Sequence, residues 1–104
     1  MPWFFLILAG LLEVGWAIGL KYSAGFTKPA ASIATVLGMI ASFFLLAQAL
    51  KTIPVGTGYA VWTGIGAAGT AIVGMWLLGE PRDVGRILCV GMILTGVLGL
   101  KYLA

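Results

Sequence analysis

The sequence predicts an all-α membrane protein built from four short transmembrane helices. Of its 104 residues, 62% are hydrophobic and only 9% are charged, and the mean hydropathy is +1.13. Soluble domains carry about 25% charged residues, so this chain lacks the polar side chains that a water-facing surface needs. A membrane-spanning helix takes about 20 apolar residues, so roughly four spans fill the chain and leave no length for a soluble domain.

Four apolar blocks follow one another, and we expect them to form a single transmembrane domain covering residues 1–104. The predicted spans are approximately residues 3–20, 30–50, 54–78 and 86–103. Within lipid every backbone N–H and C=O needs an internal partner, which favours helices. The blocks show no alternation of polar and apolar residues, so a membrane β-barrel is not expected. The first block contains Glu13, and the fourth carries Lys101 near its end, from where a long side chain reaches the membrane surface.

The charged residues lie mainly between these blocks. The net charge is +3, from six basic and three acidic residues. Basic residues that flank apolar blocks are typical of membrane proteins, so we expect a lipid bilayer and no nucleic acid as the partner. The first and third connectors hold Lys21, Lys28, Arg82 and Arg86, and the opposite side holds Lys51, Lys101 and the terminal amine. This bias is slight, which leaves insertion in both orientations open.

Glu13 is the strongest functional signal in the sequence. At 1.5 Å per residue it lies about 15 Å from Trp3, close to the bilayer centre and too deep for its side chain to reach water. Ionisable groups at such depth usually serve an ion or substrate pathway. The alternative is a permanently protonated glutamic acid that bonds a neighbouring helix. Its neighbours on the same helical face include the small residues Ala9, Gly10 and Ala17, together with Trp16, and they predict a cavity wall.

A carboxyl group at this place suits cation–proton exchange. Removal from water disfavours its charged form, whereas a bound cation favours that form. Cation and proton therefore exclude each other, which is sufficient for antiport if the site faces the two sides of the membrane alternately. The chain has no nucleotide-binding motif and no histidine, so we expect neither a cofactor nor a metal, and a transporter rather than an enzyme.

Five further residues are candidates for the site. Ser42 lies in mid-span and is suited to bond a carboxylate, although it is equally suited to bond its own helix backbone. Tyr59 and Trp62 share one face of the third block, either as part of the site or as an interfacial aromatic belt. Gly64 and Gly66 indicate either close helix packing or a hinge.

Two longer motifs accompany these residues. Residues 21–27 read KYSAGFT, and residues 53–62 read IPVGTGYAVW. With the glutamate of the first block, they resemble the small multidrug resistance transporters over essentially the whole chain. The resemblance implies an antiparallel, dual-topology homodimer in the inner (plasma) membrane, which exports cations in exchange for protons. The two copies of Glu13 would share the central site.

Within that family the chain is similar to the guanidinium exporters. This likeness rests on residues 13–17 (EVGWA) and 56–67 (GTGYAVWTGIGA). Multidrug members lack the tryptophan at the position of Trp16 and usually have serine in place of Thr63. The resemblance implies that Glu13 binds guanidinium and protons, and the residues expected to complete its hydrogen-bonded network are Trp16, Ser42, Tyr59 and Trp62. Three alternatives stay open: a broader exporter of quaternary ammonium cations, a non-transporting membrane subunit, and one half of a heterodimer.

Overall fold

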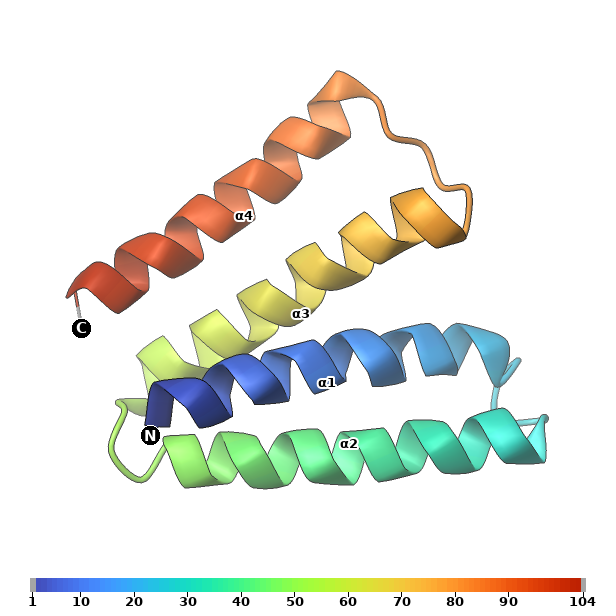
Figure 1. Ribbon diagram of the computed structural model, residues 1–104, viewed down its shortest axis with the longest axis horizontal. Coiled ribbons are helices and arrows are strands. Elements are labelled where there is room, and N and C mark those ends of the chain that lie inside the picture. The colour runs from blue at the N-terminus through green and yellow to red at the C-terminus, as the bar shows by residue number, and fades with distance from the viewer. Residues whose placement is uncertain (1, 104) are drawn as a thin grey trace.

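The computed structural model describes residues 2–103 and consists of four helices joined by short connectors (Figure 1). The helices are α1 (Pro2–Tyr22), α2 (Pro29–Ala49), α3 (Val55–Leu77) and α4 (Val84–Leu103). All four are long and apolar enough to cross a membrane, and residues 2–103 contain no strand. The predicted all-α membrane fold is therefore confirmed, and no helix end differs from its predicted boundary by more than two residues.

Proline and glycine set several of the helix ends. Pro29 occupies the first turn of α2, and Lys28 before it is extended, with φ −98° and ψ 113°. A residue before proline disfavours the helical conformation, and proline itself lacks the N–H that a first turn leaves unpaired. At the C-terminal end of α3, Gly79 follows the C-cap residue Leu78 and takes a positive φ of 69°. There the backbone N–H of Glu80 donates to the carbonyl of Gly74 over 3.2 Å, which closes the helix.

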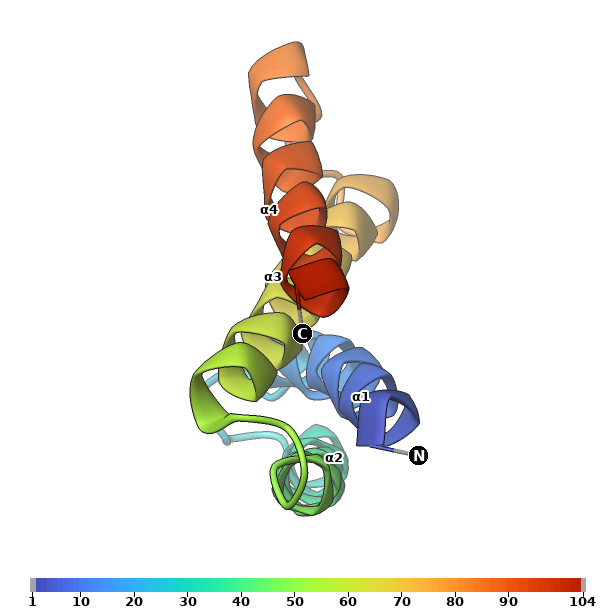
Figure 2. The ribbon, with the colours of Figure 1, turned by 90° about the vertical axis from the view of Figure 1, so that its left-hand side faces the viewer.

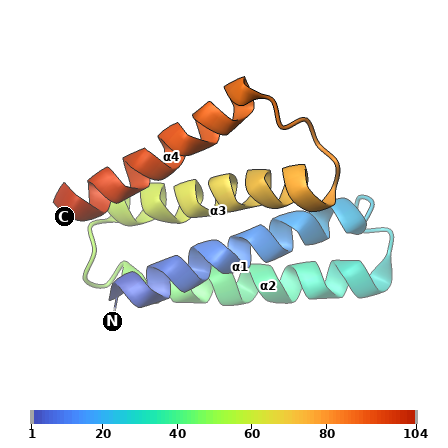
Figure 3. The same cartoon turned by 45° about the horizontal axis from the view of Figure 1, so that its top comes forward.

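The helices form a layered bundle in which α1 packs along both α2 and α3. Figure 2 shows α4 on the side of α3 that is remote from α2. In Figure 3, α4 diverges from α3 toward the connector that joins them. The α1–α2 and α3–α4 connectors lie at one end of the bundle, which we call the connector end, and the two termini lie at the other (Figure 1).

The buried core lies where α1, α2 and α3 meet. Its members are Leu6, Ala9, Leu46, Ala49, Ile53, Val61 and Trp62. Helix α4 contributes no buried residue. At its C-terminal end the ammonium group of Lys101 lies 5.1 Å from the centre of the Trp3 ring, a cation–π distance that ties the end of α4 to the start of α1. The site described below is therefore built by the first three helices alone.

Glycines allow these helices to approach closely. A Cβ atom on Gly10 would lie only 2.7 Å from the Ile65 side chain, so α1 meets α3 at a point where a larger residue does not fit. Gly15 lies about one and a half turns further along α1, and a Cβ atom on it would have no neighbour within 4 Å. The two glycines therefore differ in packing while sharing one helix.

We predict that Gly10→Val destabilises the protein by about 1–3 kcal/mol, the usual cost of overpacking a filled interface. The expected measurement is thermal unfolding in detergent, followed by circular dichroism. Gly15→Val is the matched control, because it makes the same change in helix propensity on the same helix. Equal melting temperatures for the two variants would contradict the close packing of α1 on α3.

Candidate functional site

Glu13 lies near the midpoint of α1 and faces α3. Its carboxylate sits against the backbone of Gly66, so closely that a Cβ atom at this glycine would overlap it. The Oε1 atom is buried and has no hydrogen-bond partner within residues 2–103. A buried polar atom without a partner is costly, and such atoms in a native structure need an explanation. Here the unpaired atom belongs to the one acidic side chain within the four helices.

Ser42 links three helices one turn away from Glu13. Its hydroxyl donates to the Ala9 carbonyl of α1 over 2.7 Å and accepts the indole N–H of Trp62 over 3.0 Å. Ser42 is fully buried and Trp62 is 5% exposed. A hydroxyl has one proton and an indole has one N–H, so both donors are committed. In this arrangement Ser42 and Trp62 bond each other beside Glu13, and neither donates to it.

An aromatic row continues from this network. The ring of Trp62 lies 5.5 Å from that of Tyr59 and 5.5 Å from that of Phe43, and Phe43 lies 6.2 Å from Trp16. All three pairs are tilted, a favoured geometry for aromatic rings. The buried position of Trp62 differs from that of a belt residue, whereas Tyr59 is 56% exposed. Phe43 was missed in the sequence, where it was one of many apolar residues in α2.

The two candidate hinge glycines face different helices. Gly66 lies against Glu13 of α1, and a Cβ atom on Gly64 would lie 2.5 Å from Val97 of α4. Helix α3 continues without interruption through both positions. Both glycines thus make close helix packing, and their hinge role stays a prediction.

Three more polar atoms of α1 and α3 are buried without a hydrogen-bond partner in the part of the chain that the structure describes. They are Nε1 of Trp16 and the hydroxyl oxygens of Thr63 and Thr70. Thr70 was missed in the sequence, because threonine in a helix commonly bonds its own backbone. The signal that would have found it is its spacing: Thr63, Gly66 and Thr70 are separated by three and four residues and so share one face of α3.

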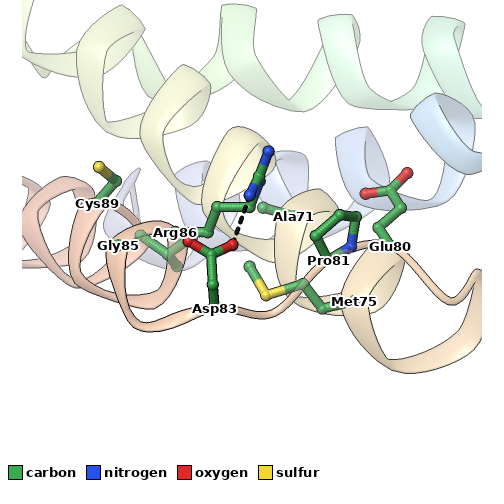
Figure 4. A pocket seen from close by; sticks show the side chains of 9 residues that line it. Ala71, Met75, Glu80, Pro81, Asp83, Gly85, Arg86 and Cys89 are labelled. Atoms are coloured by element: carbon green, nitrogen blue, oxygen red, sulfur yellow. Dashed lines mark hydrogen bonds and ion pairs between the residues drawn. The ribbon is translucent and has the colours of Figure 1, made fainter.

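A separate hollow of about 550 Å³ lies beside the α3–α4 connector, and Figure 4 shows the side chains that line it. Arg86 forms an ion pair with Asp83 there, and the two side chains are 60% and 55% exposed. The hydrogen bond from Arg86 lowers the pKa of Asp83 below its usual value. Arg86 and Asp83 are thus paired and solvated, and Glu80 beside them is exposed, so none of these charges is buried as the Oε1 atom of Glu13 is.

We predict that Ser42→Ala destabilises the protein by about 1–3 kcal/mol, because it leaves the buried Trp62 N–H without an acceptor. Ser32→Ala is the matched control on the same helix. The Ser32 hydroxyl donates only to the carbonyl of Lys28, the N-cap residue of α2, over 2.6 Å. Unfolding in detergent is the measurement, with Trp fluorescence as the probe. A Ser42→Ala variant as stable as Ser32→Ala would show that the three-helix network contributes nothing to stability.

Comparison with known proteins agrees with this architecture. The family model described as Small Multidrug Resistance protein matches residues 1–93. A guanidinium exporter of Yersinia pseudotuberculosis serotype I (strain IP32953) is 61% identical over 101 residues, which cover 97% of each chain. A guanidinium exporter of Citrobacter freundii is 56% identical over 97% of this chain and 96% of its own. One of Salmonella typhimurium (strain LT2) is 54% identical over 100% and 99%.

These relatives match the chain along nearly its whole length, well above the identity at which a family is shared. Four helices able to span a membrane accord with the same assignment. The chain therefore belongs to the small multidrug resistance family and is a multi-pass transport protein of the inner membrane.

Proposed function

We propose that this protein exports guanidinium-type cations in exchange for protons, by alternating access at Glu13. The observation that carries the proposal is the carboxylate of Glu13, which lies at mid-span with its Oε1 atom buried and without a partner among the described residues. The names of the relatives, which are 54–61% identical guanidinium exporters, support the choice of cargo. The function is transport rather than catalysis.

The chemistry of guanidinium fits this carboxylate. Guanidinium is planar, stays cationic at physiological pH, and donates its N–H groups in a fork that matches two carboxylate oxygens. Trp16 lies one helical turn after Glu13 on α1, and the rings of Trp62 and Tyr59 lie 5.5 Å apart on α3; aromatic faces of this kind attract a cation. Binding of the cation would thus give the carboxylate the partner that it lacks.

The wall beside Glu13 favours a small cargo with N–H donors. Ser42 donates to the Ala9 carbonyl and accepts from Trp62, so moving any of the three breaks a buried hydrogen bond. A bulky quaternary ammonium ion would have to displace these groups, and it has no N–H group to form a hydrogen bond in place of the broken one. This argument favours guanidinium over the broader multidrug cargo.

Exchange follows from competition for one group. A protonated Glu13 has lost the charge that binds a cation, and a cation bound to the carboxylate expels the proton. The energy of the proton gradient can then drive the cation outward without a nucleotide. For this the site has to face one side of the membrane at a time.

The same proposal includes an antiparallel homodimer. Helix α4 is apolar, contributes no buried residue and packs against α3 on one side only. Small residues Gly91, Gly96 and Gly99 have nothing within 4 Å of a Cβ position, so a second helix can approach closely there. The slight charge bias between the two ends permits both orientations.

We predict that Glu13→Gln reduces guanidinium-driven proton flux in reconstituted vesicles to the level of protein-free vesicles. The amide keeps the shape of the side chain but binds neither the cation nor an exchangeable proton. Glu80→Gln is the matched control, because Glu80 is exposed at the α3–α4 connector, and its flux should stay within about twofold of wild type, since a surface charge contributes little.

Flux that survives Glu13→Gln unchanged would reject the exchange site. A second comparison in the same vesicles tests the cargo: tetraethylammonium in excess should leave guanidinium flux nearly unchanged. Strong competition would favour the broader multidrug exporter instead.

We predict dual topology from single-cysteine labelling. In a Cys89→Ser background, Thr52→Cys and Pro81→Cys place one thiol at each end of the bundle, in exposed connectors. An impermeant maleimide added outside intact cells should label about half of each variant if both orientations insert equally. Complete labelling of one variant and none of the other would show a single orientation and contradict the antiparallel dimer.

A further inference from the structure

A groove between α1, α3 and α4 is lined by none of the site residues named above. Its volume is about 350 Å³, and every lining side chain is apolar or aromatic except that of Lys101. Trp3 and Ile7 line it from α1, Ile65 lines it from α3, and Val97 and Lys101 line it from α4. The lining residues of each helix are three or four positions apart, so each helix presents one face to the groove.

The groove runs along the helices from the membrane surface toward the bilayer centre. Trp3 and Lys101 mark its outer end, because the start of α1 and the end of α4 lie at the same end of the bundle (Figure 1). From Leu94 to Lys101 it extends about 10 Å along α4, and the hydrocarbon of one leaflet is about 15 Å deep. Acyl chains run in the same direction as spanning helices. The groove therefore has the direction and the depth of one acyl chain.

Lys101 places a positive charge at the outer end of this groove. Its ammonium group lies 5.1 Å from the centre of the Trp3 ring, a contact that neutralises no charge. The ion pair found within residues 2–103 lies at the connector end. Glu13 is at mid-span, and the other two acidic side chains of the protein are at the connector end. The ammonium group has three N–H donors, so it is able to bind an anion at the level of the lipid headgroups.

The second copy proposed above leaves this groove open. The direction of Gly91, Gly96 and Gly99 around α4 is about 145° from that of the groove-lining residues, at 3.6 residues per turn. A helix packed on these glycines therefore lies on another side of α4. An apolar chain with an anionic headgroup is complementary to both parts of the groove, since basic pockets between transmembrane helices bind anionic lipid headgroups.

We propose that this groove binds an anionic phospholipid, with one acyl chain between α1, α3 and α4 and its phosphate paired with Lys101. Three helices surround that chain, whereas a lipid on an ordinary outer face touches one side only. The lipid also joins α4, which has no buried residue of its own, to α1 and α3. This inference does not depend on the proposed exchange function.

The first test separates charge from general lipid contact. Native mass spectrometry of the full-length protein, released from neutral detergent, gives the Kd of dioleoyl phosphatidylglycerol and of dioleoyl phosphatidylcholine, which share their acyl chains and differ in net charge. Lys101→Gln removes the charge, and Lys101→Arg keeps it. Lys51→Gln is the matched control, because Lys51 is exposed in the α2–α3 connector at the same end of the bundle, outside the groove (Figure 1).

We expect wild type, Lys101→Arg and Lys51→Gln to bind phosphatidylglycerol about fivefold more tightly than phosphatidylcholine, the effect of one basic residue near the headgroups. Lys101→Gln should bind the two lipids equally. Equal affinities in wild type overturn the proposal. So does a loss of preference in Lys101→Arg, because charge would not be the cause, and so does an equal loss in Lys51→Gln, because any basic residue at that end would then serve.

The second test fills the groove. Ile7→Trp enlarges a lining residue that is 42% exposed, and Leu8→Trp is the matched control, because Leu8 is 37% exposed and does not line the groove. Leu98→Trp narrows the groove from the α4 side, and thermal unfolding in detergent identifies any variant that fails to fold.

We expect the two groove-filling variants to lose saturable binding of phosphatidylglycerol, and Leu8→Trp to bind it as wild type does. Wild-type binding in folded Ile7→Trp and Leu98→Trp overturns the proposal. The same spectra report the oligomeric state. If the groove-filling variants convert dimers to monomers and the remaining dimers still bind the lipid, the groove is an interface between copies, which also overturns the proposal.

Discussion

The rest of this molecule depends on a carboxylate that the membrane interior disfavours. Glu13 lies at mid-span, at a depth where an ionisable group is costly, and one of its oxygen atoms is buried with no hydrogen-bond partner in residues 2–103. The glycines around it provide space but no charge or hydrogen-bond partner for the carboxylate. Gly66 leaves room for the carboxylate, and Gly10 lets α3 approach α1. A site that paired this carboxylate permanently would have no energetic reason to bind a cation. The proposed exchange therefore depends on the absence of a partner for this oxygen within residues 2–103.

The polar groups around this carboxylate differ in their hydrogen bonding. Ser42 bonds both the Ala9 carbonyl and the Trp62 indole, and these two bonds tie three helices together. Nε1 of Trp16 and Oγ1 of Thr70, by contrast, have no hydrogen-bond partner within residues 2–103. Because displacing Ser42 would break two buried hydrogen bonds, its network resists displacement and is consistent with a small cargo.

Composition was enough to predict the fold, and one charge in an apolar block was enough to single out Glu13 as the candidate site residue. The starts predicted for the second and third spans, residues 30 and 54, also lie within one residue of the observed starts of α2 and α3. Which neighbouring helix each side chain faces could not be predicted, because helices that are apolar all round have no pattern that distinguishes one face from another. Thus the sequence left two options for Ser42, and the structure shows a third, a bond to the backbone of α1. For the same reason Phe43 and Thr70 could be found only after the register of α1 against α3 was known.

Helix α4 stands apart from this chemistry. Its Val97 and Leu100 pack against the core, its Lys101 lies over the Trp3 ring, and none of the site residues named above belongs to it. In lipid an apolar helix needs no covering protein, so burial does not explain why it is retained at this position. Its close approach to α3 at Gly64 instead couples it to the helix that carries Gly66, Trp62 and Thr70. If α4 mediates the proposed association with a second copy, a movement of α4 at Gly64 would be transmitted through α3 to the proposed exchange site. No residue of α4 needs to enter that site.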